Sequence, residues 1–326
     1  MRITVLGSGA WGTALACELN EGGHEVHVWG HNAEHVHEIN EARENRRYLA
    51  GVKIPATIRF TADFGVALGD SKFIVMATPS KALRETAGRL KGFSGVVVSV
   101  AKGIEHDTGL TMGQALQEAL PSAKVAVLSG PTFAPEVARR MPSAAVAASV
   151  NEEAAMLTQD VFHRPYFRVY TNHDVLGVEL GGALKNVIAI AAGVCDGLGF
   201  GDNSKAALVT RALAEIRRVG VACGAKAETF AGLSGLGDLT VTCFSRQSRN
   251  RALGERLGKG EKIADVLPTL SSVAEGYPTA RSAAKLVAKL GVEAPFIREV
   301  HALLYEGKGP KEALRDLVTR DSKSED

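Results

Sequence analysis

Short runs of apolar, often β-branched residues alternate with helical patterns over the first half of the chain. Most of these runs are apolar at every position, as is typical of strands buried between two layers of helices. Strands alternating with helices predict a doubly wound, mostly parallel α/β sheet. The expected strands are Ile3–Leu6, Glu25–Trp29, Phe73–Ala77, Gly95–Val100, Val125–Ser129, Ala144–Ala148 and Phe167–Tyr170.

The second half of the chain has a different pattern. Beyond residue 172 the β-branched runs stop and longer helical patterns predict an all-α region. No Pro- or Ser-rich linker separates the two parts, so we expect two closely packed domains, residues 1–172 and 173–326. The expected helices are Ala10–Glu21 and Glu152–Phe162 in the first half, then Asp174–Gly193, Asn203–Cys223, Ser248–Leu257, Thr279–Leu290 and a final pair near the C-terminus.

Composition argues against several classes of protein. The 326 residues hold 38 Lys and Arg against 36 Asp and Glu, so a net charge of +2 does not indicate a nucleic-acid or anionic membrane partner. The longest apolar stretch, Val187 to Cys195, is too short to span a bilayer, and no secretory signal pattern is present. We therefore expect a cytoplasmic protein. Its four cysteines form no CxxC pair, which suits reduced thiols.

Glycine is abundant, with 35 residues, and the first of them form an organised motif. Gly7-Ser8-Gly9-Ala10-Trp11-Gly12 lies between a predicted strand and a predicted helix, the context of a dinucleotide-binding turn. Gly7 would allow the tight bend, Gly9 the approach of a pyrophosphate and Gly12 the packing of helix on strand. The helix N-terminus offers free N–H groups to phosphate. The alternative is a turn that binds nothing, but a second strand follows at the right distance, so a Rossmann-type domain is predicted.

The end of the second strand bears on the choice between NAD and NADP. Strand 25–29 is followed by Gly30-His31-Asn32, without the acid that usually binds the ribose 2′-hydroxyl of NAD. A carboxylate would repel a 2′-phosphate, so its absence permits NADP, and His31 is able to hydrogen-bond either form. We predict that the protein uses NADPH or NADH, with a preference for NADPH. A loop histidine without a ligand is the alternative for His31.

Three histidines, His31, His35 and His37, crowd the segment after this strand. A protein metal site would need further ligands and groups that orient them. A solvated helix face explains the cluster as well, and we expect no bound metal.

Polar segments follow three of the predicted strands. They are residues 77–80, 101–105 and 129–134. The carboxyl ends of strands in an open α/β sheet meet at the edge where ligands bind, so we expect the three segments to line one crevice. Lys102 comes directly after an apolar strand, where a lysine directed at a ligand is more common than one on the surface.

The helical half adds further candidates. Lys185 and Asn186 interrupt an apolar helix, where desolvation would lower the pKa of the lysine and suit it to proton transfer near neutral pH. A lysine that reaches solvent at the helix edge explains the pattern equally well. Asp238 follows a glycine-rich loop. Ser248 and Arg249 begin a helix in the manner of a phosphate site, with a solvated basic helix as the alternative.

Together these segments resemble the NAD(P)-dependent glycerol-3-phosphate dehydrogenases of bacteria, in that family's order and over most of the chain. The resemblance implies reversible reduction of dihydroxyacetone phosphate to sn-glycerol 3-phosphate for glycerophospholipid synthesis. Residue types and spacing by themselves indicate only a dinucleotide, a small phosphate and a proton-transfer lysine. The matching segments are GSGAWGTALA, VWGH, ATPS, VAKGIE, SGPTFAPE, GGALKNVIAIAAG, GLGDLTVTC, QSRNR and GKGPKEAL.

The resemblance also implies roles for individual residues. Lys185 would be the general acid and base at the ketone oxygen, Lys102 would polarise the same oxygen, and Asp238 would orient Lys185 or a hydroxyl. The residues implied to bind substrate are Lys102, Gly130, Thr132, Lys185, Asp238, Ser248, Arg249 and Asn250. From the glycine-rich turn and the resemblance, the residues expected to bind the cofactor are Gly7, Gly9, Ala10, Trp11, Gly12, His31, Lys102, Ala134, Arg249, Val273 and Glu275.

Two other functions stay open on the sequence. A related two-domain 3-hydroxyacid dehydrogenase would also place a lysine and an amide on the helix after its dinucleotide domain, and Arg249 is able to bind a carboxylate. A nicotinamide-sensing regulator would keep the glycine-rich turn but would not need Lys185 or Asp238, and both are present. Similar enzymes are often dimers, so a homodimer is a further expectation, although no interface pattern is visible.

Overall fold

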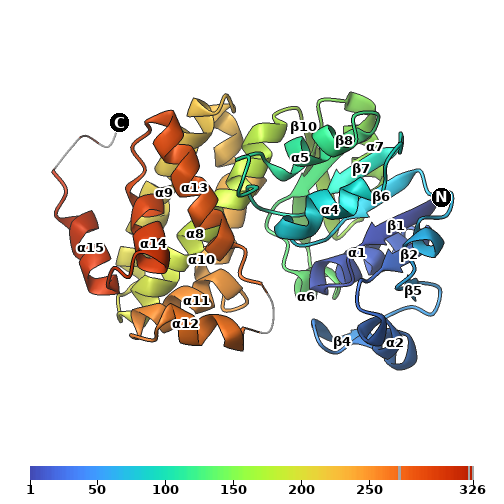
Figure 1. Ribbon diagram of the computed structural model, residues 1–326, viewed down its shortest axis with the longest axis horizontal. Helices are drawn as coiled ribbons and strands as arrows, with labels where there is room; N and C mark the ends of the chain where they lie inside the picture. The colour runs from blue at the N-terminus through green and yellow to red at the C-terminus, as the bar shows by residue number, and fades with distance from the viewer. Residues whose placement is uncertain (271–272, 322–323, 325–326) are drawn as a thin grey trace.

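The first half of the chain forms an eight-stranded sheet in the order β10-β9-β8-β7-β6-β1-β2-β5 (Figure 1). The structure is a computed structural model that describes residues 1–270, 273–321 and 324. Every neighbouring pair of strands is parallel except β8 and β9, which are antiparallel. The strands are β1 (Arg2–Leu6), β2 (Glu25–Trp29), β5 (Arg59–Thr61), β6 (Phe73–Met76), β7 (Val96–Ser99), β8 (Lys124–Ser129), β9 (Ser143–Ala148) and β10 (Phe167–Asn172).

Helices cover both faces of this sheet because its central strands are apolar on both sides. In β6, Phe73 and Val75 join the core under α1, α2 and α7, whereas Ile74 and Met76 join the core under α4 and α5. The predicted doubly wound, mostly parallel α/β fold is confirmed. The helices of this half are α1 (Ala10–Glu21), α2 (Ala33–Ala42), α3 (Phe64–Leu68), η1 (Ser80–Ala82), α4 (Leu83–Gly88), α5 (Met112–Ala119), α6 (Ala134–Val137) and α7 (Glu152–Phe162).

The second half is helical, as predicted, and is built around α8 (Val175–Gly197), which lies in the middle of the other helices (Figure 1). The side chain of Asp174 caps α8 by accepting a hydrogen bond from the Gly177 N–H, at 3.0 Å. The elements that follow are α9 (Asp202–Ala222), η2 (Ala227–Ala231), the π-helical turn η3 (Leu233–Gly237), α10 (Asp238–Phe244), α11 (Arg249–Gly258), α12 (Ile263–Val266), η4 (Leu267–Thr269), α13 (Gly276–Leu290), α14 (Pro295–Tyr305) and α15 (Pro310–Val318).

The helix α8 is long and apolar enough to cross a membrane by length and composition, but 89% of its most apolar window is buried inside the protein. Its partner α11 packs directly on its backbone. A Cβ atom on Gly193 would lie 1.9 Å from the carbonyl oxygen of Arg251, and one on Gly254 would lie 1.9 Å from that of Ile190. We conclude that α8 is the core helix of this half.

Three short strands were not expected from the sequence. β5 adds a parallel edge strand beside β2, and β3 (Glu44–Asn45) pairs with β4 (Leu49–Lys53) as a separate hairpin. These strands have two to five residues, too few to show a hydrophobic period. The helix predicted over residues 174–193 continues to Gly197. Gly193 does not end the helix; it leaves room there for the backbone of α11.

Candidate active site

The glycine-rich turn joins β1 to α1, and its three glycines differ in what surrounds them. A Cβ on Gly7, whose φ is +127°, would lie 2.5 Å from the carbonyl oxygen of Ala77, and one on Gly12 would lie 2.0 Å from that of Gly7. A Cβ on Gly9 would meet no atom of the described residues within 4 Å. Gly7 and Gly12 are therefore required by the fold, whereas Gly9 leaves open space at the N-terminus of α1. That space and the free N–H groups of the first helical turn fit a pyrophosphate.

The hairpin of β3 and β4 packs beside this turn. Asn45 donates a hydrogen bond to the Ser8 carbonyl, at 3.0 Å, and another to the Thr13 hydroxyl, at 2.8 Å. Leu49 and Val52 of β4 pack against further residues of the turn and of α6. The structure thereby brings together three of the residues predicted to bind cofactor, namely Ala10, Trp11 and Ala134.

One of the three histidines after β2 is not part of a solvated helix face, which corrects the sequence interpretation: His35 is buried, whereas His37 is exposed on α2. His31 is exposed, but His35 is buried, with its Nε2 atom 3.4 Å from the Ser8 carbonyl and its ring edge-on to Tyr48. The burial of His35 follows from the hairpin that carries Tyr48, an element that the sequence did not predict. His31 lies at the surface just after the end of strand β2.

Three residues predicted to be catalytic converge at one buried point. The Lys185 ammonium donates to Asp238 Oδ1, at 2.5 Å, and the Lys102 ammonium donates to Asp238 Oδ2, at 2.6 Å. Lys102 follows β7 in the sheet half, and Lys185 and Asp238 belong to α8 and α10 in the helical half. The exposed fractions are 6% for Lys185 and 1% for Asp238. Two ammonium groups and one carboxylate leave a net positive charge, which favours an anionic ligand.

Glycines allow this convergence. A Cβ on Gly181 would lie 2.7 Å from the Ser234 carbonyl oxygen, so the π-helical turn η3 packs on the backbone of α8 and directs Asp238 toward Lys185. Gly182 leaves room for the aliphatic chain of Lys102, which lies 3.6 Å from the position of its absent Cβ. A π-helical turn before a functional residue is a recurrent feature of active sites.

Burial and, to a smaller extent, the charge of Lys102 lower the pKa of Lys185, while Asp238 acts in the opposite direction; together these effects leave the pKa at about 8. The lysine is therefore not one that reaches solvent at the helix edge, which was the alternative on the sequence. An amine with this pKa exchanges a proton readily near neutral pH.

The segments proposed for substrate lie around the lysines. Lys102 also donates to the carbonyl of Gly130, at 3.0 Å, and the Thr132 hydroxyl donates to the same carbonyl, at 3.2 Å. Gly130 has a φ of +142°, and a Cβ there would lie 3.0 Å from the Ala144 carbonyl oxygen. These contacts place the turn after β8 beside Lys102.

The start of α11 is held by its own polar residues. Ser248 accepts a hydrogen bond from the Arg251 N–H, at 3.2 Å, and Asn250 bridges Asn186 and the N–H of Gly276, at 2.9 Å each. These side chains position the helix N-terminus next to α8. Arg249 lies in the first turn of α11 with an exposed side chain.

Glu275, before α13, joins the helical half to the sheet half. Its carboxylate accepts hydrogen bonds from the Ser80 hydroxyl, at 2.6 Å, and from the Ser80 N–H, at 3.3 Å. The charges of Glu275 and Arg249 interact. Val273 lies near Glu275 in the chain and is 39% exposed. In this structure Glu275 thus contacts Ser80 after β6, a partner that the sequence did not indicate.

Sequence reasoning missed several polar groups at this site. Thr242 accepts a hydrogen bond from the Lys185 ammonium, at 2.7 Å, and its position one helical turn after Asp238 is a signal that would have indicated it. Thr78 and Ser129, at the ends of β6 and β8, are buried hydroxyls with no hydrogen-bond partner among the described residues. Buried hydroxyls without a partner are expected where a ligand supplies one.

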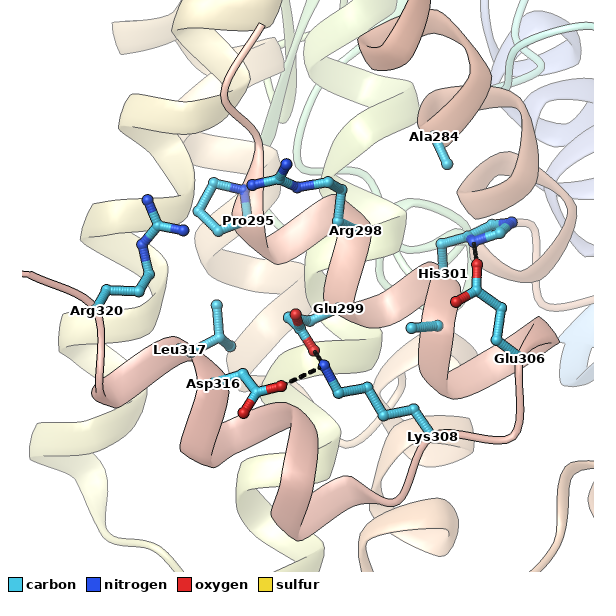
Figure 2. A pocket seen from close by; sticks show the side chains of 11 residues that line it. Ala284, Pro295, Arg298, Glu299, His301, Glu306, Lys308, Asp316, Leu317 and Arg320 are labelled. Atoms are coloured by element: carbon cyan, nitrogen blue, oxygen red, sulfur yellow. Dashed lines mark ion pairs between the residues drawn. The ribbon is translucent and has the colours of Figure 1, made fainter.

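A separate hollow lies between α13, α14 and α15, away from these residues (Figure 2). Lys308 points between Glu299 and Asp316, at 2.6 and 2.7 Å, and His301 lies 3.0 Å from Glu306. The charged groups of this hollow largely pair with each other. The described part of its lining includes none of the residues predicted to bind substrate or cofactor.

A Rossmann-type sheet with a glycine-rich turn, followed by a helical half that presents a buried lysine, defines the class of two-domain nicotinamide-dependent dehydrogenases. The chain belongs to the NAD-dependent glycerol-3-phosphate dehydrogenase family. The model of that family's N-terminus matches residues 2–155, and the model of its C-terminus matches residues 174–315. The predicted family and the prediction of an NAD(P)-dependent oxidoreductase are confirmed.

Individual relatives agree over the whole chain. It is 49% identical to the glycerol-3-phosphate dehydrogenase [NAD(P)+] of Geobacillus thermodenitrificans, over 99% of this chain and 96% of the relative. A crystal structure of glycerol-3-phosphate dehydrogenase from Coxiella burnetii superposes with a TM-score of 0.95 at 36% identity, covering 98% of this chain and 99% of that one. A D-mandelate dehydrogenase matches with a TM-score of 0.63 at 13% identity, a likeness that shows the fold alone.

Proposed function

We propose that the protein catalyses the reversible reduction of dihydroxyacetone phosphate to sn-glycerol 3-phosphate with NADH or NADPH, and so supplies glycerophospholipid synthesis. The observation that carries this proposal is the buried carboxylate of Asp238 between the ammonium groups of Lys185 and Lys102. Reduction of a ketone needs a group that donates a proton to the carbonyl oxygen, and a second cation beside it stabilises negative charge on that oxygen. Membership of the family supports the choice of substrate.

The protein's part in the reaction is to manage the charge on the ketone oxygen. When bound, the nicotinamide cofactor supplies the hydride that reduces the carbonyl carbon. Lys185 Nζ donates its proton to the carbonyl oxygen, which becomes the hydroxyl of the product, and takes the proton back in the reverse direction. Lys102 stabilises negative charge on the same oxygen, and Asp238 fixes both ammonium groups.

The phosphate of the substrate needs a site of its own, and α11 offers one. We assign the phosphate and the hydroxyls of the substrate to Arg249 and the first turn of α11, where Ser248 and Asn250 hold the helix N-terminus, together with Gly130 and Thr132. Contacts remote from the carbonyl orient it toward Lys185.

The cofactor would be held by the glycine-rich turn and the residues around it. The open space at Gly9 fits the pyrophosphate, beside Gly7, Ala10, Trp11 and Gly12. His31 would meet the adenosine ribose or its 2′-phosphate. The remaining residues assigned to the cofactor are Lys102, Ala134, Arg249, Val273 and Glu275.

An absorbance assay tests the function. Consumption of NADPH and NADH is followed with dihydroxyacetone phosphate and, separately, with a 3-keto acid. Turnover that depends on dihydroxyacetone phosphate supports the proposal. Preference for the 3-keto acid would identify a hydroxyacid dehydrogenase instead, and binding of the nucleotide without turnover of either substrate would favour a sensor.

Arg249→Ala tests the phosphate site. We expect the KM for dihydroxyacetone phosphate to rise at least about tenfold, because a hydrogen-bonded charge on the phosphate contributes about 1.5–3 kcal/mol. Arg246→Ala, an exposed arginine just before α11, is the matched control. An unchanged KM in R249A would remove Arg249 from substrate binding.

Three further assignments complete the proposal. The chain would divide into a dinucleotide-binding domain, residues 1–172, and a helical catalytic domain, residues 173–326. The protein would act in the cytoplasm and, like many similar enzymes, as a homodimer. Sedimentation at several protein concentrations would measure the assembly.

A further inference from the structure

The segment that carries Lys102 is fixed to the helical half at both of its ends. At its start, Lys102 donates to Asp238. At its end, the Thr111 hydroxyl donates to Glu179 Oε2 and the N–H of Gly113 donates to Glu179 Oε1, both at 2.6 Å. Glu179 lies on α8, the helix that also carries Lys185. One glutamate therefore connects the helix of one lysine to the segment of the other.

The contact of Glu179 with Thr111 and Gly113 is closely fitted. Glu179 is 8% exposed, and a Cβ on Gly113 would lie 2.8 Å from its Oε2 atom, so the helix start has no space for a larger residue. Burial raises the pKa of Glu179 and the hydrogen bonds from Thr111 and Gly113 lower it, which together leave the pKa at about 7. Burying a carboxyl group costs stability, and the hydrogen bonds from Thr111 and Gly113 offset part of that cost.

We propose that Glu179 is a positioning residue whose contact with Thr111 and Gly113 sets the distance between Lys102 and Lys185. This inference rests on the function proposed above for the two lysines. Their ammonium groups repel each other and are held together by one carboxylate. A second tie between α8 and residues 101–111 keeps Lys102 from withdrawing along its segment.

The chain contains a matched control for this proposal. Glu215 on α9 is also a buried glutamate, and it accepts hydrogen bonds from the N–H groups of Phe296 and Ile297, at 2.9 Å each. It caps α14 by the same chemistry with which Glu179 caps α5. Glu215 does not contact the segment of Lys102, so its loss measures the structural effect of removing a buried cap alone.

The experiment compares Glu179→Ala, Glu179→Gln and Glu215→Ala as full-length proteins. In E179A we expect kcat to fall about 10- to 100-fold, because small displacements of catalytic groups have effects of this size. The pKa that appears in the pH profile of kcat/KM should rise, since Lys102, whose charge lowers the pKa of Lys185, moves away. E179Q should lose less activity, because its amide oxygen still accepts from Gly113.

Hydrogen–deuterium exchange of residues 101–113 gives a readout that does not depend on activity. We expect faster exchange of this segment in E179A and not in E215A, although both should unfold at a lower temperature than the wild type. Thr111→Val should act in the direction of E179A, and Thr111→Ser, which keeps the hydroxyl, should not. This second pair of variants tests the same contact if E179A does not fold.

Two results would overturn the proposal. One is an E179A enzyme with the kcat, the pH profile and the exchange of the wild type. The other is an E215A enzyme whose kcat and pH profile change as much as those of E179A. Failure of the wild type to reduce dihydroxyacetone phosphate would instead contradict the proposed function, and the exchange measurement would still decide whether Glu179 holds the Lys102 segment.

Discussion

At the scale of single residues, the site depends on Lys185 being buried and still able to hold a proton. Asp238 and Thr242 accept its hydrogen bonds, at 2.5 and 2.7 Å, and Lys102 opposes its charge. Desolvation and a neighbouring cation lower the pKa of an amine, whereas a carboxylate raises it. The balance leaves Lys185 with a pKa of about 8, so both its protonated and its neutral form are populated near neutral pH.

Replacing Lys185 with alanine should lower kcat by about 10²- to 10⁴-fold, the usual contribution of a general acid. Binding of NADPH, followed by the fluorescence of the nucleotide, should persist because the glycine-rich turn is intact. Lys205→Ala is a suitable control, since Lys205 is another buried lysine, paired with Asp196 near the other end of α8. Near-normal turnover in K185A would show that another group donates the proton.

The pKa of Lys185 also sets an expected pH dependence. Reduction needs the protonated amine, so its kcat/KM should be level below about pH 8 and fall about tenfold per pH unit above it. Oxidation needs the neutral amine, so its kcat/KM should increase toward pH 8 and then level off. Rates measured in both directions from pH 6 to 10 would check this. A reduction rate that still increases above pH 9 would exclude Lys185 as the acid.

At the scale of elements, the glycine-rich turn separates what the fold needs from what a ligand needs. Gly12 is in contact with the backbone of Gly7, and Gly9 is surrounded by open space with an ordinary φ of −75°. An added methyl group should therefore destabilise the fold at Gly12 and interfere with a ligand at Gly9.

Gly12→Ala should lower the free energy of unfolding by about 1–3 kcal/mol, because its Cβ would overlap the Gly7 carbonyl. Gly9→Ala should leave the unfolding temperature nearly unchanged and raise the KM for NADPH, because its Cβ would fill the space assigned to pyrophosphate. Thermal unfolding and nucleotide titration of both variants measure this. A G9A protein that binds NADPH as tightly as the wild type would contradict the assignment.

The elements also show how far sequence reasoning reaches. Helices 10–21 and 152–162 could be predicted to the residue, because glycine and Asn151 mark their ends. The hairpin of β3 and β4 could not, since its strands are too short for a period, and the burial of His35 was missed with it. Lys185 was visible as a charge in an apolar helix. The hydrogen bond of Lys185 to Thr242 and the contact of Glu275 with Ser80 could not be predicted, because they depend on how separate elements pack.

At the scale of the whole molecule, several contacts join the sheet half to the helical half. Lys102 meets Asp238, Ser80 meets Glu275, and Thr111 with Gly113 meets Glu179. The site is complete only where both halves are present, because neither half contains both lysines. The positions of Lys185 and Lys102 relative to each other therefore depend on how the two halves pack.

Buried glutamates give the whole molecule a pH-dependent stability. Burial raises the pKa of Glu18, Glu179 and Glu215 to about 7. Each native carboxyl group keeps a proton that the unfolded chain has already released, so its contribution is fully present below pH 4.5 and is lost as pH rises through 7. These groups should lower the free energy of unfolding between pH 5 and 7, by about 1 kcal/mol or more in total.

Urea unfolding of the wild type and of Glu215→Gln from pH 5 to 8 would measure this effect. The glutamine variant lacks one of the titrating groups, so its stability should decline less with rising pH. Equal slopes for the two proteins would show that Glu215 stays ionised across the range.

The apolar helix α8 has a consequence for the synthesis of the protein. A chain made from its N-terminus releases α8 from the ribosome before α11 and α13, which cover it, have been made. During that interval, a segment that is long and apolar enough to span a bilayer is exposed to chaperones and to the machinery of membrane insertion. Translation that stops between α8 and α11 would thus yield a fragment prone to aggregate or to insert wrongly, although the finished protein hides the same helix.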